Sequence, residues 1–184
     1  MVHYSAPTLC GIKPGNLFFV NASVFSKEIF AKWQIIFWER GLASVFAKTS
    51  EDRVMVLVYN VVWAEKILKE ACVQSYLKAK GYYPCASAED FEIQMFVRMK
   101  LCLDFPHEIG IILGYPLKDV IEFERHQGRD CKYCGYWKSY SDVENAKKCE
   151  CSYKNCSYLC KKWFDEGYSV HQIVKEYKKA VNAA

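Results

Sequence analysis

The sequence has little that would export the chain or place it in a membrane. Its first stretch, MVHYSAPTLCGIKPG, has neither the positive start nor the apolar run of a signal peptide. No uninterrupted apolar stretch approaches the roughly 18 residues that a membrane-spanning helix needs. We therefore expect a cytoplasmic protein that has no membrane partner.

Motifs of the common enzyme classes are also missing. The sequence has no phosphate-binding loop, no dinucleotide fingerprint, no G-x-S-x-G and no H-E-x-x-H. These absences argue against the usual nucleotide-dependent enzymes, hydrolases and zinc proteases, and leave open an enzyme of another kind. The chain also lacks internal repeats and low-complexity tracts, which favours one ordinary domain over residues 1–184.

Charge of one sign is not in large excess. The 25 Lys and Arg residues face 21 Asp and Glu residues, and the formal charge is +4. Proteins that bind nucleic acid usually have a denser basic patch, so we do not expect nucleic acid as the main partner. Half of the residues are hydrophobic, which is typical of a globular protein.

Hydrophobic periodicity predicts an α+β fold. In residues 1–60 we expect an irregular start, an N-terminal strand at LFFV, a helix over 26–41 and a β-hairpin over about 42–59. Residues 61–184 should be mainly helical, with no strand in the C-terminal half. The expected helices there cover 62–80, 88–105, two short segments within 105–128, and segments that begin at the capping boxes SDVE and SVHQ. The whole chain should contain six to seven helices around one small antiparallel sheet.

Several sequence blocks together resemble a bacterial family of unknown function that is found largely in anaerobes. The blocks are APTLCGIKPGNLF, EDRVMVLVYN, FPHEIGIILGYPLKDVIEF, CGYWKSY and NCSYLCKKWFDEGYSV. The resemblance extends nearly from end to end. It implies a bacterial cytoplasmic protein whose thiols are exposed to little oxygen. The resemblance supplies no reaction, substrate or cofactor.

Ten cysteines are the most unusual feature of the composition. In a reducing compartment they should be thiols, which leaves core packing, metal binding or redox chemistry. Cys131 and Cys134 form C-x-x-C, and Cys156 and Cys160 form C-x-x-x-C, with the second pair on one face of a helix. Two close pairs of soft ligands are typical of zinc sites and can also hold an iron–sulfur cluster. We therefore take these four thiols as candidate metal ligands.

Other uses of the cysteines stay open. Cys156 and Cys160 also fit an apolar helix stripe and could simply pack in the core. Cys131 and Cys134 could be a redox dithiol, although the strand-then-helix context of thioredoxin is missing. Cys149 and Cys151 could replace other ligands. For the scattered remainder we expect core filling: Cys10, Cys72, Cys85 and Cys102.

Two further sites are candidates. His3 and Lys13 in the N-terminal loop, together with His107, could serve an enzyme or a small-molecule-binding protein, with the histidines as acid, base or ligand and the lysine holding an anion.

Residues 106–126 have the pattern of a helix-turn-helix, although the second helix is rich in carboxylates that DNA would repel. An aromatic cluster in the CGYWKSY region could line a pocket: Tyr133, Tyr136, Trp137 and Tyr140.

The leading hypothesis is a cytoplasmic protein that binds zinc or an iron–sulfur cluster, as an accessory to metal handling or redox metabolism. Its partner would be another metal or redox protein. The small-molecule site and the helix-turn-helix module, which would bind DNA or a protein, are the alternatives.

Overall fold

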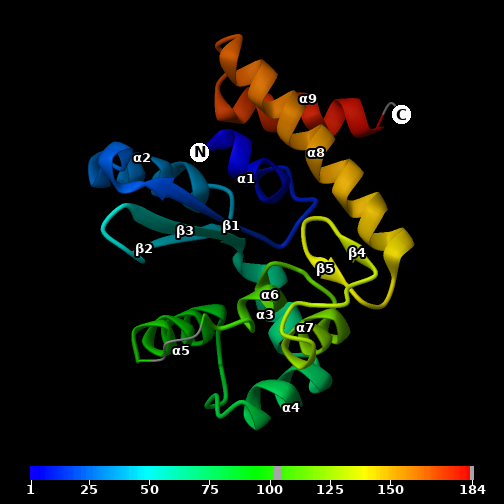
Figure 1. Ribbon diagram of the computed structural model, residues 1–184. Helices are drawn as coiled ribbons and strands as arrows, with labels where there is room; N and C mark the ends of the chain where they lie inside the picture. Colours follow the sequence, from blue (N-terminus) through cyan, green and yellow to red (C-terminus); the bar gives the residue numbers. More distant parts are fainter. Residues whose placement is uncertain (102–104, 183–184) are drawn as a thin grey trace. The chain divides into compact units, whose positions relative to one another are not determined.

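The computed structural model of the chain describes residues 1–101 and 105–182. The chain divides into two compact units, which we call the sheet unit (Met1–Asn60 with Cys151–Ala184) and the helical unit (Val61–Glu150). Within the described ranges there are nine α-helices, a three-stranded antiparallel sheet and a two-stranded sheet, so the α+β class is confirmed (Figure 1). The organisation as one domain stays a prediction.

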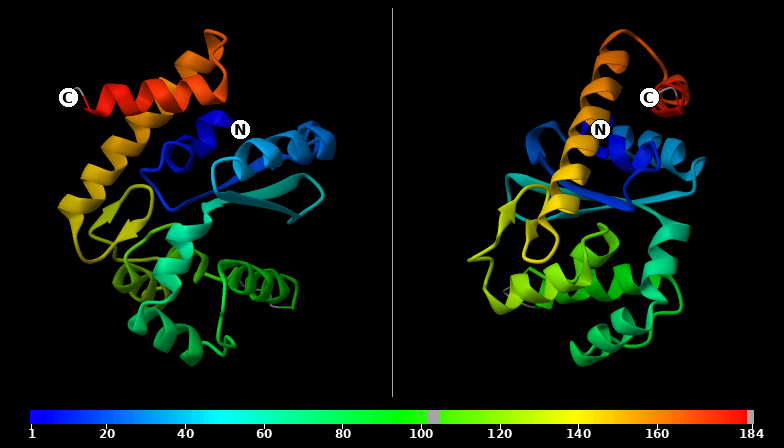
Figure 2. Two further views of the ribbon diagram at one scale, coloured as in Figure 1. Left: turned by 180° about the vertical axis from the view of Figure 1, so that it is seen from behind. Right: turned by 90° about the vertical axis from the view of Figure 1, so that its right-hand side faces the viewer.

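The sheet unit combines both ends of the chain. Its elements are α1 (Val2–Leu9), β1 (Gly15–Asn21), the short 3-10 helix η1 (Ala22–Val24), α2 (Lys27–Trp38), β2 (Leu42–Lys48), β3 (Arg53–Asn60), the C-terminal part of α8 (Val143–Asp165) and α9 (Val170–Asn182). Helices α1 and α2 pack on β1 and β2, and both lie on the same face of the sheet (Figure 2).

The predicted hairpin forms the sheet, with β3 in the centre. The strand order is β1-β3-β2, and Leu57 of β3 is opposite Leu17 on one side and Val45 on the other. A strand with neighbours on both edges and residues packed on both faces has no polar face, which explains why β3 is apolar over almost its whole length. Residues 54–59 are all buried.

Helix α1 differs from the irregular start that the sequence predicts. Pro7 lies inside this helix, where its ring and missing N–H normally disfavour helix formation. The helix nevertheless buries Val2, Ala6 and Leu9 against the rest of the core. Burial of that face outweighs the local cost of proline, and the helix ends at Cys10.

Helix α2 agrees with the sequence pattern at its ends. The Ser26 side chain accepts a hydrogen bond from the Ile29 N–H, and Gly41 beyond the helix has a φ of +68°. Phe30 and Phe37 of this helix are buried, whereas the Ile29 side chain is exposed.

The helical unit contains shorter elements than the sequence predicts. They are α3 (Val61–Leu68), α4 (Ala71–Ala79), α5 (Ala88–Leu101), α6 (Ile109–Ile112), α7 (Leu117–Arg125), β4 (Tyr133–Cys134), β5 (Lys138–Ser139) and the start of α8. The single helix predicted over 62–80 is broken at Glu70, whose extended backbone caps α4. The hairpin β4–β5 corrects the prediction of a C-terminal half without strands. No helix in the described part of the chain is both long enough and apolar enough to cross a bilayer.

The capping boxes have different outcomes. Ser169 and Gln172 exchange side-chain and backbone hydrogen bonds before α9, as predicted. Before α8 the cap is instead Asp142, which accepts from the Asn145 N–H. The Ser141 hydroxyl instead donates a hydrogen bond to Asp119.

Candidate metal centre

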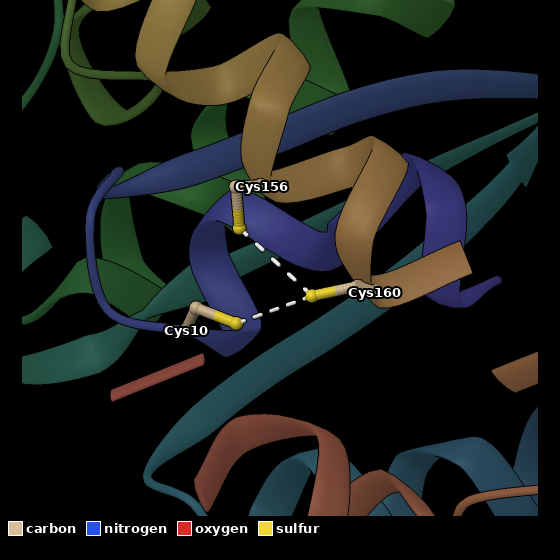
Figure 3. A group of neighbouring side chains, drawn as sticks. All are labelled: Cys10, Cys156 and Cys160. Atoms are coloured by element: carbon tan, nitrogen blue, oxygen red, sulfur yellow. Dashed lines mark hydrogen bonds between the residues drawn. The ribbon is translucent and has the colours of Figure 1, made fainter. Parts of the chain in front are cut away.

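Three thiols from two distant segments meet inside the sheet unit. Cys10 follows the last turn of α1, and Cys156 and Cys160 lie one helical turn apart on α8. Figure 3 shows the three sulfur atoms pointing toward one another. Among the residues that the structure describes, this triad is the one group of three or more metal-ligating side chains whose donor atoms all lie within 4.8 Å of one another.

The triad lies in the hydrophobic core. The exposed fractions are 6% for Cys10, 0% for Cys156 and 1% for Cys160. The surrounding core comes from all parts of the sheet unit and includes Val2, Leu9, Phe18, Val58, Val170 and Ile173. The site is therefore enclosed by aliphatic and aromatic side chains, and little water can enter it.

The sulfur separations fit a single metal ion. The Cys10 and Cys160 sulfurs are 3.5 Å apart, and the Cys156 and Cys160 sulfurs are 4.0 Å apart. Two thiolates that bind one tetrahedral zinc ion at about 2.3 Å lie about 3.8 Å apart, so the observed distances bracket that value. Thiolates of a [4Fe–4S] cluster bind separate irons, so their sulfurs lie farther apart than sulfurs that share one ion. The geometry therefore favours one ion over a cluster.

The contacts between the three thiols shift their pKa values in different directions. Contacts with Cys156 and Cys160, together with burial, raise the pKa of the Cys10 thiol. Contacts with Cys10 and Cys156 lower the pKa of the Cys160 thiol. For Cys156, the contact with Cys10 lowers the pKa, but the contact with Cys160 and burial outweigh it and the pKa is raised. The first proton therefore leaves Cys160, and the two neighbouring S–H groups stabilise its thiolate.

Tyr177 of α9 borders the triad. Its hydroxyl forms hydrogen bonds with the side chains of Cys156 and Ser152, which lie one turn apart on α8. Burial and the neighbouring Cys156 raise the pKa of this phenol, so it remains protonated at neutral pH. Tyr177 is thus a hydrogen-bond donor beside the sulfur of Cys156.

The predicted ligands fall in both units. Cys156 and Cys160 lie together in the triad, whereas Cys131 and Cys134 belong to the helical unit, where Cys134 ends β4 and is exposed. A site that joins all four thiols stays a prediction, as does a redox function of the C-x-x-C pair.

A buried carboxylate holds the hairpin that contains Cys134. Asp119 of α7 accepts hydrogen bonds from the Trp137 indole, from the backbone N–H of Tyr140, and from both the N–H and the hydroxyl of Ser141. Burial raises the pKa of Asp119, but these hydrogen bonds, that of the Ser141 hydroxyl foremost, outweigh burial and lower it. Trp137 and Tyr140 are therefore buried structural residues of this unit.

The other cysteines differ in their surroundings. Cys151 on α8 is exposed and Cys149 is half-buried, so neither belongs to the triad. The expected core filling is wrong for Cys72, which is exposed, and Cys85 is half-buried. Cys102 lies outside the described residues.

The alternative small-molecule site has its residues in both units. His3 is exposed on α1 and packs edge-on against Tyr4, while His107 is exposed in the helical unit and packs against Phe123. Lys13 is buried with its ammonium group 5.8 Å from the centre of the Tyr153 ring. A joint role of His3, Lys13 and His107 stays a prediction.

The segment proposed as a helix-turn-helix contains α6, a single turn, and α7. On α7, Glu122 pairs with Arg125 and with His126, and Glu124 pairs with Lys80. Arg125 and His126 thus each lie close to a carboxylate, and the DNA-binding alternative stays a prediction.

Cys10 is the member of the triad that sequence reasoning missed. It lies 150 positions from Cys160, so no spacing motif connects the two. Recognising α1 as a helix would have placed Cys10 at its end, but Pro7 argued against that helix. Burial of Cys10 was expected, whereas its contact with the α8 thiols needed the folded sheet unit.

The comparisons with known proteins agree with the sequence resemblance in that the matching family is one of unknown function, while its origin in bacteria and anaerobes stays a prediction. The family model described as "Protein of unknown function (DUF3793)" matches residues 1–174, so the chain belongs to that family. Neither a curated protein nor a solved structure matches the chain.

Proposed function

We propose that this protein binds one thiophilic metal ion through Cys10, Cys156 and Cys160. The observation that supports the proposal is the convergence of three buried sulfurs at separations of 3.5 and 4.0 Å. Free cysteine is often buried, but packing alone does not require three thiols from two distant segments to aim at one point. With such a site, the protein would serve as an accessory in cytoplasmic metal handling or redox metabolism, with another metal or redox protein as its partner.

The proposed site shares Cys156 and Cys160 with the four-thiol site that the sequence predicts. Cys10 takes the place of the C-x-x-C pair as the partner of Cys156 and Cys160. The i, i+4 pair on α8 supplies two sulfurs from one rigid helix, and α1 supplies the third. Ligands on rigid elements hold their geometry well, so the apoprotein needs little rearrangement to take up an ion.

A cadmium titration tests the proposal directly. Protein purified and handled without oxygen is titrated with Cd²⁺, and the ultraviolet charge-transfer absorption of cadmium–thiolate bonds is followed. We expect saturation at one ion per chain, and loss of that absorption in Cys10→Ser, Cys156→Ser and Cys160→Ser. Cys151→Ser is the matched control, because Cys151 is on the same helix but exposed.

Folding must be checked for each variant, since the triad is buried. Circular dichroism and thermal unfolding identify variants that fail to fold, and alanine replaces serine where the hydroxyl is not tolerated. A folded wild-type protein that binds no Cd²⁺, or binding that survives in a folded triple variant, would contradict the proposal.

A further inference from the structure

If the proposed metal binding is correct, the number of ligands in the triad indicates which metal ion it binds. Zinc in structural sites is almost always four-coordinate. Among the residues that the structure describes, the group of converging donors has three members and no histidine or carboxylate. Soft thiolate ligands select Cu(I), zinc or an iron–sulfur cluster, and of these Cu(I) is the ion that accepts three sulfur ligands without a fourth.

A fourth zinc ligand would have to come from a side chain such as Tyr177, which borders the triad. Its hydroxyl is instead used in hydrogen bonds with the side chains of Ser152 and Cys156. With its hydroxyl engaged by these two side chains, Tyr177 contacts the Cys156 sulfur and is not counted among the ligands. Such outer contacts orient a metal ligand without binding the ion themselves.

Water is a poor fourth ligand in these surroundings. The three sulfurs belong to a core cluster of apolar side chains, and Cys156 and Cys160 are almost fully buried. A buried water needs two to four polar partners. The polar group identified beside the triad, the Tyr177 hydroxyl, is already paired with Ser152 and Cys156.

We propose that the triad takes Cu(I), held by the sulfurs of Cys10, Cys156 and Cys160 with no fourth ligand. The ion binds as Cu(I) and leaves as Cu(I). Loading displaces thiol protons and involves no oxidation or reduction.

The test compares Cu(I) with Zn²⁺ on the same protein under anaerobic conditions. The background is a full-length chain in which the exposed thiols are replaced, so that they do not compete for copper: Cys72→Ser, Cys134→Ser and Cys151→Ser. Cu(I) is supplied from a chromophoric chelator, and X-ray absorption spectroscopy counts the neighbours of each bound ion. We expect one Cu(I) per chain, a shell of three sulfurs without nitrogen or oxygen, and displacement of Zn²⁺ by one equivalent of Cu(I).

Variants of Tyr177 and Cys10 separate the possible outcomes. Tyr177→Phe should keep the three-sulfur shell and weaken Cu(I) binding by about tenfold, as outer contacts typically do. Cys10→Ser, or Cys10→Ala if serine does not fold, should remove one sulfur from the shell. Tight four-coordinate Zn²⁺ that Cu(I) does not displace, or an oxygen neighbour that disappears in Tyr177→Phe, would overturn the copper assignment and leave the proposed metal binding intact. A folded protein that binds neither ion would overturn both.

Discussion

The sulfur of Cys10 lies 3.5 Å from the sulfur of Cys160, although 150 positions separate the two residues. This contact joins the end of α1 to the middle of α8 within the core of the sheet unit. Because Cys156 is one turn away on α8, the same contact creates a three-thiol site. The N-terminal helix and the C-terminal part of the chain are thereby linked at the point where an ion would bind.

The pH dependence of stability should reveal the charge state of the triad. The folded pKa of Cys160 is lowered, so between that pKa and about 8.5, the ordinary value for a free thiol, the unfolded chain binds one proton more than the folded chain. The free energy of unfolding therefore rises with pH in this window, by at most about 1.4 kcal/mol per pH unit. Anaerobic urea unfolding of metal-free protein at several pH values measures this rise, and Cys160→Ser should remove it.

Above the ordinary thiol pKa the sign reverses. Cys10 and Cys156 have raised pKa values, so they keep protons that the unfolded chain releases, and stability falls as the pH increases. If the free energy of unfolding depends on pH in the same way for wild-type protein and folded Cys160→Ser, the folded triad does not contain a thiolate at Cys160.

A bound ion should stabilise the sheet unit. Binding to the folded state alone adds about 2.7 kcal/mol to the free energy of unfolding when the free ion is at 100 times its dissociation constant. Hydrogen exchange followed by mass spectrometry should show slower exchange in α1 and around Cys156 on α8 after loading. A chelator should reverse the effect, and Cys160→Ser should show none. Slower exchange confined to the β4–β5 hairpin would place the ion elsewhere.

Removing the C-x-x-C pair tests the four-thiol site that the sequence predicts. If the triad is sufficient, Cys131→Ser combined with Cys134→Ser should leave the stoichiometry and affinity for Cd²⁺ unchanged. Isothermal titration of the folded double variant beside wild-type protein provides the comparison. A clear loss of affinity in the double variant would instead make these two thiols ligands.

Asp119 should be important for stability and not for metal binding. Asp119→Asn places an amide among four donor groups, and we expect a loss of about 2–3 kcal/mol in the free energy of unfolding. The folded pKa of this carboxyl is lowered, so its contribution is present above the ordinary pKa of about 3.9 and is lost as the pH falls through the folded value. Chemical unfolding of both proteins at a series of pH values below about 3.9 should show their stabilities converging, and a constant difference would contradict this role.

The sequence predicted those parts of the fold in which local pattern and burial agree. The β2–β3 hairpin follows from two apolar runs around a polar turn, and the Ser169–Gln172 box follows from a spacing that forms its own hydrogen bonds. The two α8 thiols share a face because four positions are about one helical turn.

The remaining features depend on tertiary contacts. Pro7 argued against a helix at α1, which forms because its apolar face is buried. The break between α3 and α4 at Glu70 has no glycine or proline to mark it in the sequence. The β4–β5 hairpin is held by Asp119, whose partners lie 18 to 22 positions away. Cys10 could not be connected with Cys160 because a contact between distant segments leaves no spacing in the sequence.

The identity of the ligands can be measured most directly by NMR of protein loaded with one equivalent of ¹¹³Cd. Scalar coupling between the metal nucleus and cysteine β-protons identifies each bound sulfur individually. We expect a single cadmium resonance coupled to Cys10, Cys156 and Cys160. Coupling to Cys131 and Cys134, or a folded protein without a bound cadmium signal, would contradict the assignment of the triad as the metal site.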